Sequence, residues 1–147
     1  RWWMFFSLPD RPLDALHLAF ADCLTGPWHL HPNNPVATGL THGRMGGTPL
    51  VHEGTLYLPL QDNRSTYGGG ITWLQVTQIT PDSFSATPGT QMKGTGLHPD
   101  FPDGLHTLAA CGSVTLVDVK RLDYSRKRYA IDWQRRWRRL VKSSQNF

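Results

Sequence analysis

The stretch that decides the fold is residues 43–84, GRMGGTPLVHEGTLYLPLQDNRSTYGGGITWLQVTQITPDSF. Three runs within it, at 48–52, 55–60 and 71–79, have the alternating apolar side chains typical of strands. A Glu-Gly pair at 53–54 supplies a two-residue turn between the first two runs. Three leucines alternate along the second run, so they lie on one face of it. The stretch therefore predicts one antiparallel sheet.

A polar cluster interrupts this sheet. Gln61, Asp62 and Arg64 lie in an expected loop, and Tyr67 with the glycines at 68–70 forms a flexible elbow after it. Asp, Gln and Arg carry planar polar groups that hydrogen-bond two sugar hydroxyls at once. The cluster is therefore a candidate sugar-facing pocket. The alternative is that Asp62 and Arg64 fix the turn while Gln61 bonds the backbone.

The chain before this stretch resembles a second, similar unit. Strands are expected at 2–6 and 28–30, and the sequence HPNNP at 31–35 is a loop. Segment 13–24 fits both helical spacing and strand alternation, and the strand is favoured.

The chain after this stretch predicts one more strand pair. Residues 83–87 form a short outer strand, and the Gly/Pro-rich residues 88–103 are expected to be irregular. Runs at 105–110 and 114–119 then form a hairpin around Cys111.

The composition favours an all-β protein. The 147 residues are enough for one ordinary domain with a substantial core, and they include 14 Gly and 11 Pro, which imply many turns. Groups of three or four short antiparallel strands, recurring about every 45 to 50 residues, suggest propeller blades. A single β-sandwich is the other arrangement that fits.

The formal net charge of +4 is unevenly distributed. Residues 1–119 contain five Lys/Arg against nine Asp/Glu, whereas residues 120–147 contain ten against two. From 128 to 142, apolar side chains recur at helical spacing, which predicts a basic amphipathic helix. We expect it to dock on a neighbouring domain, with a membrane-surface role or disorder as alternatives. A nucleic-acid role would rest on this tail alone, so no nucleic-acid partner is expected.

Neither the two cysteines nor the N-terminal residues indicate the cellular compartment of the protein. Cys23 and Cys111 fit either a disulfide or two buried free thiols, and the thiols are favoured. No signal peptide or membrane span is visible. Because the chain begins inside a hydrophobic strand without an initiator Met, we expect it to be a piece of a longer protein.

Several motifs, taken together, resemble a known family. They are RWWMFF at 1–6, LTGPW at 24–28, HPNNPV at 31–36, GRMGG at 43–47, LYLPLQD at 56–62 and YGG at 67–69. In this combination, residues 1–121 resemble the N-terminal domain of glucosamine inositolphosphorylceramide transferases and its bacterial relatives.

The resemblance implies a five-bladed β-propeller like that of the β-fructosidase- and arabinanase-like glycoside hydrolases. Residues 1–121 would be its C-terminal part, about two to three blades, with the hairpin in the closing blade. Residues 122–147 would be a basic amphipathic tail or linker helix. The missing N-terminal blades would hold the axial carboxylates that carry the chemistry in the hydrolases, so this fragment alone is expected to be inactive.

The resemblance also implies site residues. Arg44, Gln61, Asp62 and Tyr67 match the family pattern, whereas Leu58 stands where the family tends to have Arg. Together with Arg64, they are the predicted substrate-binding residues.

His106 completes the predicted site. Its segment matches the family's closing-blade strand, where an axial histidine would contact substrate. The alternative is a half-buried histidine with satisfied hydrogen bonds.

No catalytic pair can be assembled from this chain. Glycosidic cleavage needs two carboxylates, one of them with a raised pKa. Asp62 is a weak catalytic candidate without a partner, and Glu53 is expected at a hairpin tip. Asp118 is expected to pair with Lys120 or Arg121.

No metal or cofactor is expected. His29 and His31 are two residues apart but have no third ligand in reach, so a surface or turn role is favoured. The glycines at 68–70 open a strand and lack a following Lys-Ser/Thr, so they are not a phosphate loop.

Two functions from different classes fit these observations. One is a carbohydrate-active domain that works with glycosyl transfer to a sugar or glycolipid acceptor, with a fused transferase domain as a partner. The other is a non-catalytic propeller that binds a glycan or acts as a scaffold. The resemblance implies the Golgi for a eukaryotic transferase, with membrane association through the full-length protein, and the cytoplasm for a bacterial relative.

Overall fold

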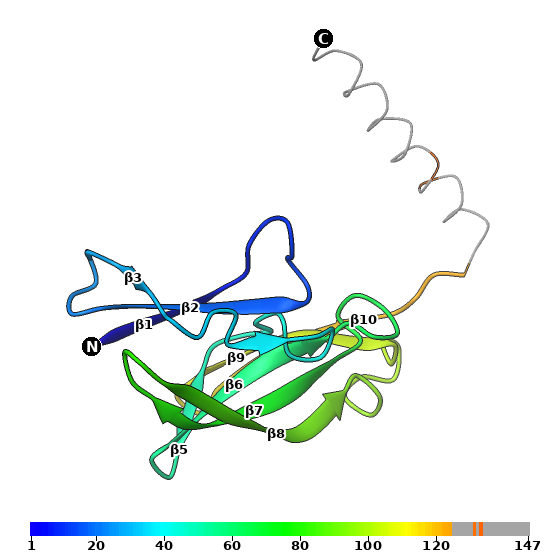
Figure 1. Cartoon of the computed structure of the whole chain (residues 1–147). Coiled ribbons are helices and arrows are strands. Elements are labelled where there is room, and N and C mark those ends of the chain that lie inside the picture. Colours follow the sequence, from blue (N-terminus) through cyan, green and yellow to red (C-terminus); the bar gives the residue numbers. More distant parts are fainter. Residues whose placement is uncertain (125–130, 132, 134–147) are drawn as a thin grey trace.

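The computed structural model describes residues 1–124, 131 and 133, and residues 1–124 are all-β, as predicted (Figure 1). Its ten strands form three antiparallel groups. The basic helix predicted from 128 to 142 lies, apart from Ile131 and Trp133, outside the described residues. Within them, no helix is long and apolar enough to cross a membrane.

The first group is a sheet centred on β2 (Ala15–Ala21). It pairs with β1 (Trp2–Phe6) on one side and with two short strands on the other, β3 (His29–Leu30) and β4 (Ala37–Thr38). The strand predicted within 13–24 is therefore confirmed, and β4 was not predicted.

The HPNNP loop ties this sheet together between β3 and β4. The Asn34 side chain pairs with the backbone of Leu18, accepting from its N–H and donating to its C=O, both at 2.8 Å. His31 is 2% exposed, and its Nε2 lies 2.9 Å from the Thr80 carbonyl oxygen of the next sheet. The expected turn role of His31 holds, because its Nδ1 accepts from the Asn33 N–H, but its side chain is buried rather than on the surface.

The second group is a four-stranded meander that follows the chain order. It contains β5 (Leu50–His52), β6 (Thr55–Asp62), β7 (Gly70–Ile79) and β8 (Phe84–Lys93). Its first turn has positive φ at Glu53 (48°) and Gly54 (76°), as a two-residue hairpin requires.

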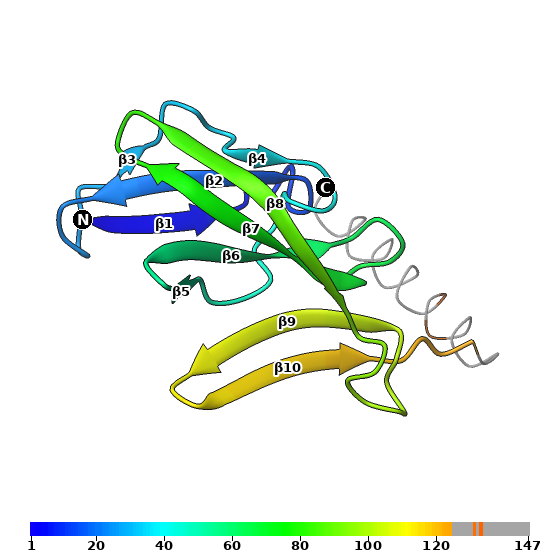
Figure 2. The same ribbon diagram turned by 90° about the horizontal axis from the view of Figure 1, so that it is seen from below.

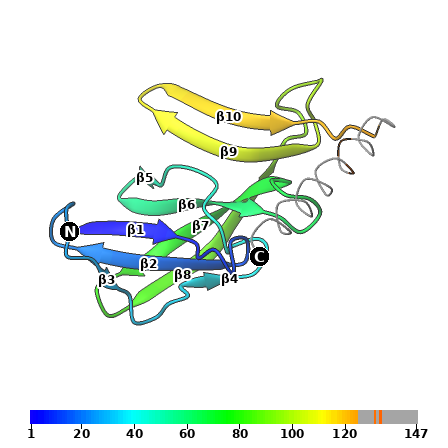
Figure 3. The ribbon, with the colours of Figure 1, turned by 90° about the horizontal axis from the view of Figure 1, so that it is seen from above.

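The third group is the hairpin of β9 (Gly104–Cys111) and β10 (Val114–Lys120). Figures 2 and 3 show this hairpin on one side of the β5–β8 sheet and the β1–β2 pair on the other. Isolated bridges from residues 43–47 connect the groups, from Gly43 to Asp14, Met45 to Leu60 and Gly47 to Leu108.

The main core lies between the first two sheets. The predicted leucine face of β6 forms its centre, since Leu58 and Leu60 are 0% exposed and pack with Leu16 of β2. On the opposite face of the meander, Ile71 of β7 is fully buried, as is Leu105 of β9, which contacts β7. Farther along this face, Tyr57, Trp73 and Gln75 are partly exposed, so the second face is covered only near Ile71.

Two strands extend two or more residues beyond their predicted ends. β6 runs through Gln61 and Asp62, because both pair with β7, so the loop covers residues 63–69 only. β8 continues to Lys93, through the region predicted as irregular. Pro88 is accommodated there because β8 is an edge strand and the register shifts beside it, at residues 72–74.

Both cysteines are free, as favoured, but they are exposed rather than buried. Cys111 lies at the tip of the β9–β10 hairpin, beside Gly112 at φ 58°. Cys23 lies in the loop after β2, where its thiol contacts the Gly26 carbonyl oxygen at 2.9 Å. Turns between strands leave small side chains in solvent, which is why the expectation of burial was wrong.

Candidate functional site

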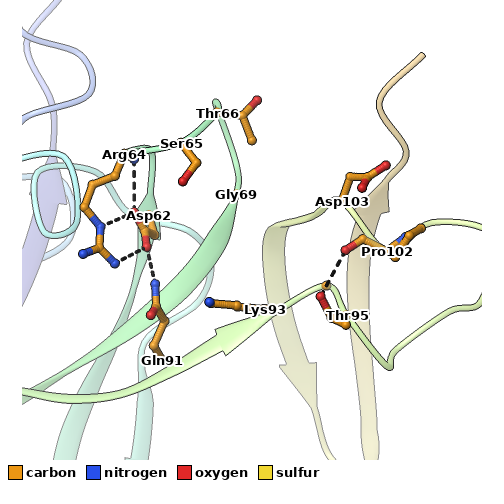
Figure 4. A pocket seen from close by; sticks show the side chains of 11 residues that line it. Asp62, Arg64, Ser65, Thr66, Gly69, Gln91, Lys93, Thr95, Pro102 and Asp103 are labelled. Atoms are coloured by element: carbon orange, nitrogen blue, oxygen red, sulfur yellow. Dashed lines mark hydrogen bonds and ion pairs between the residues drawn. The ribbon is translucent and has the colours of Figure 1, made fainter. Parts of the chain in front are cut away.

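A polar pocket of about 310 Å³ opens between the end of the meander and the loop that leads into β9 (Figure 4). Its lining comes from three segments. They are the end of β6 with its following loop, the end of β8, and the 94–103 loop: Asp62, Arg64, Ser65, Thr66, Gly69, Gln91, Lys93, Gly94, Thr95, Pro102 and Asp103. The pocket therefore depends on the tertiary fold, because no single segment forms it.

Asp62 is the most heavily bonded side chain of this pocket. Its Oδ1 accepts from the Arg64 backbone N–H at 3.1 Å and from Arg64 Nε at 3.0 Å. Its Oδ2 accepts from Arg64 Nη2 at 2.8 Å and from the Gln91 amide. The bidentate pair fixes the guanidinium plane of Arg64 against the buried carboxylate.

These bonds keep Asp62 ionised. The Arg64 hydrogen bonds lower the pKa of the Asp62 carboxyl and outweigh the opposing effect of its burial. The same pairing raises the pKa of Arg64. A general acid needs a raised pKa, so the electrostatics suit Asp62 for binding and positioning.

Two more charged residues line the pocket, Lys93 beside Gln91 at the end of β8 and Asp103 in the segment across from it (Figure 4). Asp103 Oδ2 accepts from the Leu122 backbone N–H at 2.8 Å. Behind it, Lys120 donates to Thr66 Oγ1 at 3.1 Å and to the Tyr67 carbonyl oxygen. Burial lowers the pKa of Lys120, while the nearby charge of Asp103 opposes that shift. Lys120 thus joins β10 to the loop after β6.

The other side of this loop faces β9. Gln61 Nε2 donates to the His106 carbonyl oxygen at 3.2 Å, and the Tyr67 ring lies 4.8 Å from the His106 ring, centroid to centroid. The guanidinium of Arg44 lies over the Tyr67 ring, 6.0 Å from the ring centroid. His106 Nδ1 contacts Asp118 Oδ2 at 3.1 Å. These residues form a second polar cluster, in contact with the hairpin.

Four buried polar atoms around the end of β6 have no hydrogen-bond partner among the described residues. They are Gln61 Oε1, Asn63 Nδ2, His42 Nε2 and His106 Nε2. Burial lowers the pKa of His42, and the Arg64 charge lowers it further. Unpaired buried polar atoms are rare in folded proteins, and two of these four belong to the predicted site residues Gln61 and His106.

Comparison with known families identifies the domain. A family model described as "Glucosamine inositolphosphorylceramide transferase 1, N-terminal" matches residues 3–93. The chain belongs to this family. The match contains β1 to β8, and with them most of the pocket lining. The predicted resemblance is confirmed over this range, while the β9–β10 hairpin lies beyond it.

Two curated relatives carry the same family name. They are called glucosamine inositolphosphorylceramide transferase 1, from Oryza sativa subsp. indica and subsp. japonica. Each is 29% identical to this chain over 93 residues, which is 59% of this chain and 12% of the relative. The chain therefore spans a small part of their length. No solved structure matches it.

The predicted site residues of this family member fall into two groups. Asp62 and Arg64 line the pocket. Gln61 and Tyr67 both contact His106 on the hairpin side. Arg44 stacks over the Tyr67 ring on the same side, and its Nη1 donates to the Pro12 carbonyl oxygen at 2.9 Å. Whether these residues bind substrate stays a prediction.

Other expectations about single residues are now resolved. Glu53 lies at an exposed hairpin tip, as predicted. Asp118 contacts His106 and not Lys120 or Arg121, because Asp118 pairs with Thr107 and His106 is the unpaired residue beside that pair, at the bulge of the hairpin. Position 58, where the family tends to have Arg, points into the apolar core.

Four residues of the site were missed by sequence reasoning: His42, Gln91, Lys93 and Asp103. Three of them follow or interrupt Gly/Pro-rich sequence, where no periodic pattern marks a strand end. Among the described residues, no group of three or more His, Cys, Asp or Glu side chains gathers as a metal site would require.

Proposed function

We propose that this chain is part of a carbohydrate-active domain in a protein that transfers glycosyl groups, and that its pocket binds the sugar or glycolipid acceptor. The observation that carries the proposal is the family match over β1–β8, which includes the Asp62–Arg64 pair and Gln91. The relatives are named glucosamine inositolphosphorylceramide transferase 1. A polyhydroxylated acceptor is bound through fixed planar polar groups, and the Arg64 guanidinium, held in place by Asp62, is such a group.

The proposed architecture is a five-bladed β-propeller with residues 1–121 as its C-terminal part. The four-stranded meander β5–β8 supports this reading, because such a sheet is the unit that propellers repeat. Residues 122–147 would then be the link to the rest of the protein.

A non-catalytic, glycan-binding role is the second candidate. It is favoured by the lowered pKa of Asp62, which holds the carboxylate without a proton to donate. In this reading, the pocket orients the acceptor while chemistry takes place on another part of the protein. The two candidates share the same pocket and differ in whether Asp62 affects turnover or only affinity.

Kinetics of the full-length protein test the proposal. We expect Asp62→Asn to raise the KM for the sugar acceptor about tenfold or more, because Arg64 loses its fixed position. If Asp62 only binds, kcat stays close to that of the wild type. The control is Glu53→Gln at the exposed hairpin tip. Unchanged acceptor KM and kcat in Asp62→Asn would contradict the proposed site.

A further inference from the structure

The carboxylate of Asp62 has no acceptor capacity left for a ligand. A carboxylate offers about four lone-pair positions on its two oxygens. The backbone and guanidinium of Arg64 occupy three of them, and the Gln91 amide occupies the fourth. The buried carboxylate of Asp62 therefore holds Arg64 and Gln91 in place.

Two cationic side chains retain free donors in the pocket. Arg64 uses two of its five side-chain N–H groups on Asp62, and its side chain is 59% exposed. Lys93 lines the same pocket, and its side-chain ammonium makes no hydrogen bond or ion pair with the part of the chain that the structure describes. Figure 4 shows the Lys93 side chain between Gln91 and the 94–103 loop. Both are available to a ligand.

The second carboxylate of the pocket is also engaged. Asp103 accepts from the Leu122 backbone N–H, and its charge interacts with Lys120. Lys120 in turn is held by Thr66 and the Tyr67 carbonyl oxygen, so it stays in place without a ligand. Because Asp62 is fully hydrogen-bonded while Arg64 and Lys93 keep free N–H groups, the pocket presents two charged donors to a ligand.

We propose that the pocket binds the phosphoryl group of a phosphorylated sugar or polyol, with Arg64 and Lys93 contacting the phosphate oxygens. The inference rests on the proposed function and names the charged part of the ligand. A guanidinium held in one plane and a nearby ammonium match the tetrahedral oxygens of a phosphate. A neutral sugar would leave these donors only partly satisfied. The phosphoryl group can belong to a soluble sugar phosphate or to a lipid headgroup.

Titration calorimetry on the full-length protein tests this inference with glucose and glucose 6-phosphate as probes. We expect the phosphate ester to bind at least about tenfold more tightly than the neutral sugar at low ionic strength. Lys93→Gln should remove most of that ratio, and Lys93→Arg should restore it. Arg1→Gln is the matched control, because it removes an equal charge from the terminus of β1, away from the pocket (Figure 2).

Vesicles separate the two sources of the phosphoryl group. Binding to phosphatidylcholine vesicles only when they contain phosphatidylinositol assigns the pocket to a lipid headgroup. Binding to glucose 6-phosphate alone assigns it to a soluble ester.

Two results would overturn the inference, and they differ from each other. Equal affinity for glucose and its phosphate, unchanged by Lys93→Gln, rejects the phosphate site but keeps a sugar pocket. No binding of any of these probes rejects the sugar pocket as well. Since the Lys93 side chain makes no bond to the described fold, both variants are expected to keep the wild-type melting temperature, and that measurement accompanies the titrations.

Discussion

The two sides of the loop after β6 carry polar groups in opposite states. On the pocket side, Asp62 has every acceptor position filled. On the hairpin side, Gln61 and His106 each keep a buried atom without a partner among the described residues. The neighbouring residues Gln61 and Asp62 therefore lie in two separate environments, because successive residues of a strand point to opposite faces of the sheet. One side is organised for a charged ligand, and the other joins the meander to the hairpin.

The largest expected effect concerns the hairpin side as a whole. β10 leaves Val114, Leu116 and Val117 exposed, and one edge of the hairpin pairs with no strand within the described residues. Open edges with apolar side chains promote association. We expect residues 1–147 alone to aggregate or to sediment as oligomers in analytical ultracentrifugation. A monomer with one cooperative melting transition would argue strongly against a partial propeller.

Gly68 tests how tightly the loop is held against the hairpin. Its φ is 63°, and a Cβ there would lie 2.6 Å from His106 Cδ2. We expect Gly68→Ala to destabilise the full-length protein by about 3 kcal/mol, from backbone strain and overpacking together. Gly54→Ala is the control, since Gly54 also has positive φ but nothing within 4 Å, and it should cost about 1 kcal/mol. Equal costs in urea denaturation would show that the loop does not pack on His106.

Asp62 tests the pocket side in the same assay. Asp62→Asn keeps the size of the side chain but loses the charge-assisted hydrogen bonds to Arg64. We expect a loss of about 2 kcal/mol in the free energy of unfolding. Glu53→Gln, at the exposed tip, should change it by less than about 0.5 kcal/mol. A stability loss no larger than that of the control would mean that the Asp62–Arg64 pair does not order the pocket.

The pH dependence of stability should report the same pair. The pKa of Asp62 is lowered in the folded state, so its contribution is fully present above the ordinary aspartate pKa near 4. It is lost as the pH falls through the lower, folded-state value. The stability difference between the wild type and Asp62→Asn should therefore shrink as urea denaturation is repeated from pH 6 down to pH 3. A constant difference over that range would place its cause elsewhere.

Gln61 should give the smallest effect. Gln61→Met keeps the side-chain length and removes one hydrogen bond to the His106 carbonyl oxygen. It also removes the buried Oε1 that has no partner among the described residues. These changes oppose each other, so the free energy of unfolding should change by less than about 1 kcal/mol. A loss as large as that from Asp62→Asn would mean that Gln61 is as firmly bonded as Asp62.

Local patterns predicted the sheets better than they predicted the site. The alternating leucines of β6 and the Glu53–Gly54 turn are encoded in neighbouring residues, and both are present in the structure. The strand choice for Ala15–Ala21 also held, because alternation within the segment was sufficient. These features need no knowledge of distant segments.

The sequence predicted one side of the pocket and missed the other. Asp62 and Arg64 stand in a recognisable polar cluster, and both line it. Gln91 and Lys93 were missed because Pro88 and Gly89 interrupt the strand pattern of the sequence. β8 continues past them only because it pairs with β7. Asp103 belongs to a loop without local pattern, and tertiary packing alone brings it to the site.

A crystal structure of the full-length protein with glucose 6-phosphate bound would show directly whether the pocket is a phosphate site. We predict phosphate oxygens within hydrogen-bond distance of Arg64 and Lys93, with the Asp62–Arg64 pair unchanged. A sugar phosphate bound elsewhere on the protein, with none of it in this pocket, would contradict a phosphate site between Arg64 and Lys93.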